Sequence, residues 1–300
     1  MNLTATDESQ LPPLAPPAPG GGLVEVFRQR YLLKTLVRNS IKSSYQGTLL
    51  GWLWSYVQPG IRFAIYYFLF QVMMARGGED LPNFAIHMVC GMVMVHLFTE
   101  SFSGGTQSLV RNRRLLAKLP MPKALFPVAK TTVALYHTFP MLVILVVIDL
   151  MIGWRPDWVG LAAGLLAFAI VLPLGLALAM FFSILNVFMR DFGKLIGTLT
   201  MLVTFSVPMI YPFTFVQTMG ENVARIYLLN PVAEAVLLMQ RCFWTGSTDD
   251  PADFAARHLP DDLWMRGGVM LVVSLVLLVL STLWFTKQEL MESYAMKAPM

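Results

Sequence analysis

Long apolar runs, separated by short basic or acidic segments, make up most of the chain. A helix that spans a bilayer needs about 20 largely apolar residues. The runs therefore predict six spans, at about 53–74, 84–103, 127–152, 158–188, 195–212 and 263–286. The clearest run, VMLVVSLVLLVLSTLWF, belongs to the last of them. We expect an all-α polytopic membrane protein, with one transmembrane domain over residues 23–300.

The basic residues are distributed unevenly between the loops on the two sides of these spans. One side carries 15 of the 22 Lys and Arg residues, while six lie on the other side and Arg62 lies within the first span. Cytoplasmic loops carry an excess of Lys and Arg. The bias predicts six spans with both termini in the cytoplasm.

The composition supports the membrane assignment and excludes several other classes. Hydrophobic residues make up 56% of the chain and charged residues 13%, with a mean hydropathy of +0.61, whereas soluble domains have about 25% charged residues. The net charge of +4 follows from basic cytoplasmic loops, so we expect no nucleic-acid partner. Cys90 and Cys242 are expected to be unpaired thiols, and the four histidines form no metal-ligand pattern. Residues 1–22, rich in Pro and Gly, lack the pattern of a signal peptide and are expected to be a disordered tail.

The segment before the first span, about 24–45, has the pattern of an amphipathic interface helix. Its basic residues repeat every four positions, which places them on one stripe: Arg30, Lys34, Arg38 and Lys42. Such a helix lies in the membrane interface. It either anchors the topology alone or also contacts a cytoplasmic partner. Gly47 and Gly51 would then let the chain bend into the first span.

A second basic segment, SLVRNRRLLAKLPMPKALFPVAK at 108–130, lies between the second and third spans. We expect a short cytoplasmic helix that ends near residue 119, because several prolines follow. It is either a docking element or simply a positive inside loop, and its basic residues are Arg111, Arg113, Arg114 and Lys118. A third charged site, Arg190–Asp191, is expected to be a structural turn between the fourth and fifth spans.

The loop before the last span has a different character. Asn230–Pro231 is typical of a helix N-cap followed by Pro in the first turn. The apolar segment Val232 to Trp244 that follows is too short to span, and it suits a re-entrant or interfacial helix. We expect residues 213–244 to form an outer region of short helices, followed by an acidic, solvated loop.

Aromatic residues could line a path for sugar rings. The candidates are Tyr56, Phe63, Tyr67, Phe70, Phe205 and Tyr211. The alternative for each is the aromatic belt at a membrane interface. Arg62 and Glu100 lie within or near apolar runs, where snorkelling or an interfacial position accounts for both without a proton relay.

Several catalytic motifs are absent. The chain has no GxxxxGK[ST] phosphate loop, no HExxH and no GxSxG. We therefore expect a non-catalytic transport subunit without a cofactor of its own. Energy for active transport would come from a separate subunit or from an ion gradient.

Four stretches, in their order and spacing, resemble the permease subunits of type-2 ABC exporters, in the branch that moves lipid-linked polysaccharides such as O-antigens, teichoic acids and galactan. They are RNSIKSSYQGTLLGWLWSYVQPGI, RNRRLLAKLPMPKALFPVAK, NVFMRDFGKLIGTLTMLVTFSVPMIYP and LLNPVAEAVLLMQRCFW. They are similar to that family's interface helix, its coupling-helix region, its Arg-Asp turn with the following span, and its Asn-Pro helix. The likeness covers roughly residues 24–290.

The resemblance implies a dimer of this chain, with each copy paired to an ABC ATPase subunit that holds ATP and Mg²⁺. It implies that the two basic segments contact the ATPases, that Asn230 and Pro231 belong to an outer gate, and that a lipid-linked polysaccharide is the substrate. Membrane lipids would be the remaining partners.

Other functions remain open at this point. A type-2 ABC permease for a drug or a lipid would have the same general pattern. An ion-coupled secondary transporter would need acids or histidines deep in the membrane and paired halves, and a membrane glycosyltransferase would need acids at the cytoplasmic face. Neither of the last two patterns is evident.

Overall fold

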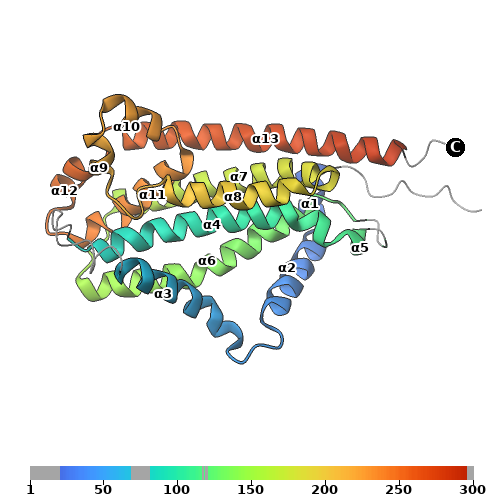
Figure 1. The fold of residues 1–300 in the computed structure, drawn as a ribbon, viewed down its shortest axis with the longest axis horizontal. Helices are drawn as coiled ribbons and strands as arrows, with labels where there is room; N and C mark the ends of the chain where they lie inside the picture. Colours follow the sequence, from blue (N-terminus) through green and yellow to red (C-terminus); the bar gives the residue numbers. More distant parts are fainter. Residues whose placement is uncertain (1–20, 69–81, 117, 119–120, 296–300) are drawn as a thin grey trace, which may run out of the picture.

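The computed structural model describes residues 21–68, 82–116, 118 and 121–295. In these residues the regular structure is helical throughout (Figure 1). The elements are α1 (Gly22–Arg28), α2 (Arg30–Tyr45), η2 (Gly51–Leu53), α3 (Trp54–Tyr67), α4 (Phe84–Arg111), α5 (Arg113–Leu116), α6 (Leu125–Ile152), α7 (Trp158–Phe188), α8 (Asp191–Phe205), α9 (Phe213–Thr218), α10 (Glu221–Tyr227), α11 (Pro231–Cys242), η4 (Thr245–Ser247), α12 (Pro251–His258) and α13 (Leu263–Ala295).

Four of the described helices are long and apolar enough to cross a membrane: α4, α6, α7 and α13. The bent pair α10–α11 is a fifth candidate, as a broken span or a re-entrant loop. This makes the chain a polytopic helical membrane protein. Helix α3 ends at Tyr67. The rest of the first predicted span, up to residue 74, falls within residues 69–81, which lie outside the described part of the chain. The count of six spans therefore stays a prediction.

Several helices end at other residues than the spans predicted over them, and the span ends themselves stay predictions. Helix α4 continues past residue 103 and ends at Arg111. Helix α8 ends at Phe205 instead of reaching 212, because Pro208 and Pro212 have no N–H to continue the helical ladder. At about 1.5 Å per residue, its 15 residues extend about 22 Å, which is less than the roughly 30 Å hydrocarbon core.

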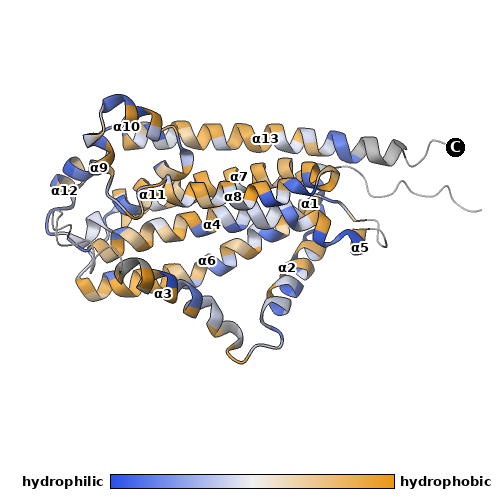
Figure 2. Ribbon diagram, in the orientation of Figure 1, coloured by the Kyte–Doolittle hydropathy of each residue, from blue (hydrophilic) through white to orange (hydrophobic). Residues whose placement is uncertain are grey.

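Helices α4, α6, α7, α11 and α13 pack side by side as one bundle (Figure 1). Small residues let α4 approach α7 closely. A Cβ added at Gly105 would lie 2.4 Å from Ala179 Cβ, and one added at Gly175 would lie 2.9 Å from Ser101 Cβ. Such contacts between small residues are typical of helix packing in membranes. The outward surfaces of α6 and α13 are mostly apolar (Figure 2).

The N-terminal segment forms two helices instead of the single helix predicted over 24–45. The helix breaks at Gln29, whose backbone N–H still bonds to Glu25 O. Helix α1 begins at Gly22, so the predicted tail 1–22 ends sooner, and residues 1–20 lie outside the description. Gly22 adopts a positive φ of 52° and packs against Thr286 of α13. The first described helix therefore contacts the last one.

The bend between α2 and α3 occurs where the sequence predicts it. Gly47 and Gly51 have φ values of 77° and 49°, in the left-handed region that favours glycine. The Tyr45 and Ser55 hydroxyls form a hydrogen bond across the bend. Helices α2 and α3 thus form an open V beside α6 (Figure 1).

Candidate functional site at the basic end of the bundle

Most of the charged segments picked out by the sequence lie at one end of the bundle. The α1–α2 pair, α5, the α7–α8 turn and the end of α13 all lie there (Figure 1). The seven residues proposed to contact an ATPase are all exposed: Arg30, Lys34, Arg38, Arg111, Arg113, Arg114 and Lys118. Their role in coupling stays a prediction.

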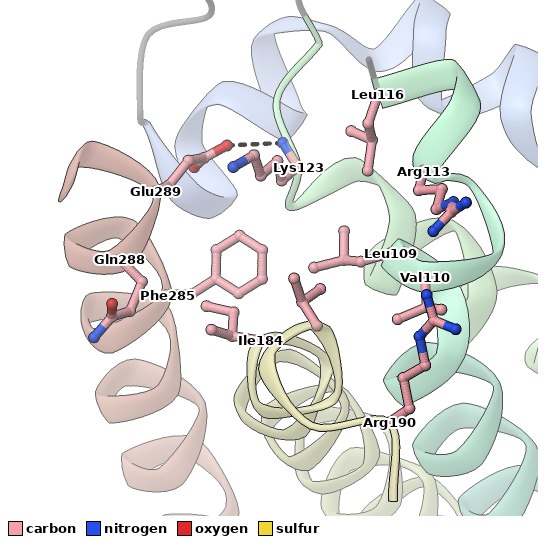
Figure 3. A pocket seen from close by; sticks show the side chains of 11 residues that line it. Leu109, Val110, Arg113, Leu116, Lys123, Ile184, Arg190, Phe285, Gln288 and Glu289 are labelled. Atoms are coloured by element: carbon pink, nitrogen blue, oxygen red, sulfur yellow. Dashed lines mark hydrogen bonds between the residues drawn. The ribbon is translucent and has the colours of Figure 1, made fainter. Parts of the chain in front are cut away.

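A pocket of about 390 Å³ lies between the elements at this end (Figure 3). Apolar side chains of α4, α7 and α13 form its floor, among them Leu109, Ile184 and Phe285. Arg113, Lys123 and Arg190 add positive charge to its lining. Of the predicted docking residues, only Arg113 lines the pocket, and the predicted turn residue Arg190 lines it on the same side (Figure 3).

The docking element is shorter than predicted. Ser108–Arg111 continue α4, and only Arg113–Leu116 form the separate turn α5. The break occurs at Asn112, whose side-chain amide donates to Ser108 O over 2.8 Å. A side chain that binds nearby backbone competes with regular helix in this way. Arg111 and Arg114 therefore belong to different helices.

The end of α13 is tied to the loop that leads into α6. The backbone N–H of Lys123 donates to Glu289 Oε1 over 2.8 Å (Figure 3). Glu289 is 8% exposed. A movement of this loop would therefore be passed to α13 through a buried polar contact.

The Arg190–Asp191 turn is held by a buried asparagine that no sequence motif indicates. Asn186 Oδ1 accepts the backbone N–H of Gly193 over 2.9 Å, and Asn186 Nδ2 donates to Thr106 O of α4 over 3.2 Å. Arg190 itself precedes α8, and Asp191 is the first residue of α8, where an acid favours the helix dipole. The structure thus contains the predicted turn, and it links α7, α8 and α4.

The stripe on α2 matches its pattern. Its basic residues are exposed, while Leu32, Leu33 and Leu36 pack against the apolar cluster at this end. Two aromatic residues, Phe27 of α1 and Tyr31 of α2, are 81% and 78% exposed. Helix α2 therefore has one face packed against the bundle and one exposed, basic face.

At the opposite end, α10 and α11 meet at 94°. Asn230 caps α11, since its Oδ1 accepts the Val232 N–H over 3.0 Å, and Pro231 follows in the first turn. This confirms the predicted cap. Val232 to Gln240 are all buried, so α11 lies inside the bundle, while its re-entrant or interfacial place in the membrane stays a prediction.

Polar contacts that no local pattern indicates hold α11 in place. Arg241 forms an ion pair with Asp157 at the start of α7, over 2.9 Å. Gln240 Nε2 donates to Pro208 O, and the buried Trp244 donates its indole N–H to Pro82 O. The partners in these contacts are 32 to 162 residues apart. Residue spacing in a single sequence does not predict contacts over such separations.

The six aromatic candidates do not form one surface in the described structure. Phe70 lies outside the described residues, as does the side chain of Tyr67. Phe63 packs against the core, and Phe205 is 53% exposed. The Tyr211 ring lies beside Tyr227 and Phe215. A shared path lined by all six stays a prediction.

Cys90 and Cys242 are buried and unpaired, as expected. Among the described residues, no group of His, Cys, Asp and Glu has the geometry of a metal site. The site described above is therefore a set of exposed cations around an apolar pocket. Such a surface suits docking and transmission of movement.

Comparison with known proteins agrees with this arrangement. The family model described as ABC-2 type transporter matches residues 31–244. The O-antigen export system permease protein RfbA of Myxococcus xanthus is 28% identical over 231 residues, which cover 75% of this chain and 85% of that protein. A protein of the same name from Klebsiella pneumoniae is 24% identical over 218 residues, covering 72% of this chain and 81% of its own. The match over residues 31–244 shows that the chain belongs to the ABC-2 type transporter family.

Proposed function

We propose that this chain is the permease subunit of an ATP-driven exporter that carries a lipid-linked polysaccharide across the bacterial plasma membrane. Its relatives named O-antigen export system permeases, matched over more than 80% of their own length, carry this proposal. ATP would be bound and hydrolysed by a separate ABC ATPase subunit, because this chain has no phosphate-binding loop.

The basic end of the bundle is the proposed contact with the ATPase. Exposed cations there come from α2, α4 and α5, and by the positive-inside rule this end is cytoplasmic. A movement of α5 would be transmitted to α13 through the Lys123–Glu289 hydrogen bond. It would be transmitted to α7 through the apolar side chains that form the floor of the pocket. Asn230 and Pro231, at the sharp α10–α11 bend, would act at the outer gate.

A second copy of the chain is the proposed partner within the membrane. Exposed large apolar side chains cover α3, α8 and parts of α6, and these surfaces suit contact with lipid or with another copy. The polysaccharide would pass between the two copies.

Co-purification tests the subunit assignment. The chain, tagged and expressed with the ABC ATPase encoded beside it, is expected to retain that ATPase in mild detergent, and the complex is expected to hydrolyse ATP. Recovery of the chain without any ATPase, at normal export in the same cells, would overturn the proposal.

Charge reversal tests the docking site. Arg113→Glu with Arg114→Glu is expected to reduce export at least tenfold while leaving the chain at normal abundance in the membrane. Arg155→Glu, at an exposed arginine of the opposite end, is the control and is expected to export normally. Normal export in the double variant would place the contact elsewhere.

Accumulation of polysaccharide inside cells that lack the chain distinguishes this function from the alternative. A permease for a drug would instead give sensitivity to that compound with normal surface polysaccharide.

A further inference from the structure

The pocket at the basic end of the bundle has two kinds of lining (Figure 3). Its floor is apolar, and its charged residues lie around that floor: Arg113, Lys123, Arg190 and Glu289. The pocket volume of about 390 Å³ is within the range of about 300–1,000 Å³ that is typical of ligand pockets. A ligand with an apolar part and a charged part would fit both linings.

The apolar floor lies at the inner edge of the membrane. Phe285 of the floor is 22 residues from the start of α13 at Leu263, which corresponds to about 33 Å along the helix. The hydrocarbon core is about 30 Å thick, so the floor lies where acyl chains end and lipid headgroups begin. Val187 also lines the pocket, and it is exposed on α7 beside the exposed Phe188. Part of the lining therefore belongs to the apolar outer surface of the bundle.

Two arginines of the pocket carry positive charge that no acid of the described residues balances. Arg113 and Arg190 are exposed and lie on the same side of the pocket (Figure 3). Among the described residues, neither forms an ion pair with a carboxylate. Asp191, which follows Arg190, pairs with Lys194 over 3.7 Å. Glu289, the acid of the pocket, is 8% exposed and accepts a backbone N–H of the loop before α6.

Two guanidinium groups on one side of a pocket favour a phosphate group as ligand. Each guanidinium presents a planar fork of N–H donors that matches the oxygens of a phosphate. Basic pockets between membrane helices on the cytoplasmic side are typical sites for acidic lipid headgroups. A soluble anion would use the two arginines and leave the apolar floor without a partner, whereas a lipid would use both.

We propose that this pocket binds one acidic glycerophospholipid of the inner leaflet. Arg113 and Arg190 hold its phosphate, and the first part of an acyl chain lies on Leu109, Ile184 and Phe285. The lipid is a resident part of the folded subunit, not the exported substrate. It fills the space between α5 and the ends of α7 and α13. The proposal does not rest on the proposed function, because the ligand belongs to the membrane itself.

Lipid binding to the full chain, purified in mild detergent, tests the proposal. The probe is phosphatidylglycerol, which is acidic, and phosphatidylcholine with the same acyl chains is the zwitterionic comparison. Native mass spectrometry counts the lipids bound to each chain. Phosphatidylglycerol is expected to bind at one tight site, at least tenfold more tightly than phosphatidylcholine. Equal affinity for the two lipids would overturn the proposal.

Paired substitutions test the two arginines. Arg113→Gln with Arg190→Gln is expected to weaken phosphatidylglycerol binding at least tenfold. Arg111→Gln with Arg114→Gln is the matched control, because it removes two exposed arginines of the same end that do not line the pocket. The control is expected to bind phosphatidylglycerol as the unmodified chain does. Equal weakening in both variants would show attraction by the whole basic surface and would overturn the pocket.

Filling the pocket tests its apolar part. Val110→Trp adds an indole ring at a partly buried lining position of α4. It is expected to weaken phosphatidylglycerol binding at least fivefold while both arginines are present. Thermal unfolding confirms that the variant is folded, and Val187→Trp, at an exposed lining position, makes the same test should Val110→Trp fail to fold. Unchanged binding in a folded variant would overturn the proposal.

Three further measurements distinguish other occupants of the pocket. Inorganic phosphate in large excess is expected to leave phosphatidylglycerol bound, and displacement by it would assign the arginines to a free anion. A polyprenyl pyrophosphate, as a model for the anchor of a lipid-linked glycan, is expected to displace little phospholipid at equal concentration. Complete displacement would assign the pocket to the substrate. The complex with the ATPase is expected to retain the phospholipid, and its release on assembly would assign the pocket to the ATPase contact. Each of these three displacements would overturn the resident lipid.

Discussion

Helices α4 and α13 are both long enough to cross the membrane, yet their surroundings are opposite. In α4, 78% of the apolar window is buried, against 22% in α13. The buried helix is the less hydrophobic of the two, and it carries glycines, histidines and serines. The exposed helix contains the most continuous run of Val and Leu in the chain. In a membrane protein, the hydrophobicity of a helix therefore indicates contact with lipid more than it indicates burial in the protein core.

Helix α11 extends the comparison. It is only 12 residues long and includes Glu234, Gln240 and Arg241, but its side chains are among the most buried in the described structure. Its apolar run is too short to predict a span, yet its side chains lie at the centre of the bundle. Polar residues there are tolerated because protein, not lipid, surrounds them.

The largest expected effect comes from the same type of substitution made in α4 and in α13. Leu97→Ala on α4 removes a side chain that is fully buried, and it is expected to cost about 2–5 kcal/mol of unfolding free energy. Leu283→Ala on α13 removes one that is 64% exposed, and it is expected to cost less than about 0.5 kcal/mol. Unfolding of the purified protein in mixed micelles measures both. Equal losses would show that α13 is covered by protein in the folded state.

A double-mutant cycle measures how strongly α11 is fixed to α7. The Arg241–Asp157 pair is partly buried, with side chains 12% and 36% exposed, and its coupling energy is expected to be about 1.5–3 kcal/mol. The reference pair Arg225–Glu221 is 66% and 78% exposed and is expected to give about 0.5 kcal/mol or less. The same coupling for both pairs would contradict the central role of α11.

Two neighbouring glycines on α4 separate packing from helix propensity. Gly105→Ala places a methyl group 2.4 Å from Ala179 Cβ, and it is expected to cost about 1–3 kcal/mol by overpacking. Gly104→Ala meets nothing within 4 Å and is expected to be neutral or to stabilise by up to about 1 kcal/mol. Thermal unfolding in detergent compares the two. A stable Gly105→Ala protein would mean that α4 and α7 pack less tightly than described.

The smallest expected effect is a pH dependence at the entry to α13. Arg266 donates to Asp262 over 2.7 Å and holds the pKa of this carboxyl below its usual value of 3.8. A carboxyl with a lowered folded-state pKa stabilises the protein above its unfolded pKa, and this contribution disappears as the pH falls through the folded value. Asp262→Asn is expected to cost below about 1 kcal/mol between pH 5 and 8, because both groups are partly exposed. The difference from the unmodified chain should vanish below the pKa, and a cost that persists there would assign it to packing.

The elements that the sequence predicts well are those with a local cause. The N-cap at Asn230, the bend at Gly47 and Gly51, the turn at Arg190 and the exposed stripe on α2 each depend on neighbouring residues. The sequence does not indicate the break at Gln29, because the apolar and basic periodicities continue across it.

What the sequence predicts poorly depends on partners far along the chain. Asn186 looks like an ordinary residue near the end of a span until Thr106 and Gly193 are placed beside it. Burial of α11 depends on three other long helices, α4, α7 and α13. The length of α4 is a different case, because the apolar residues stop near residue 103 while the helix continues to Arg111.

The contact between Gly22 of α1 and Thr286 of α13 has a consequence for biosynthesis. The ribosome makes α1 first and α13 last, so the N-terminal helix cannot reach its final position until nearly the whole chain has been inserted. Contacts between such distant segments form late and slowly. Closure of this contact would thus mark the completed subunit, and a nascent or truncated chain that lacks α13 would leave α1 unattached to it.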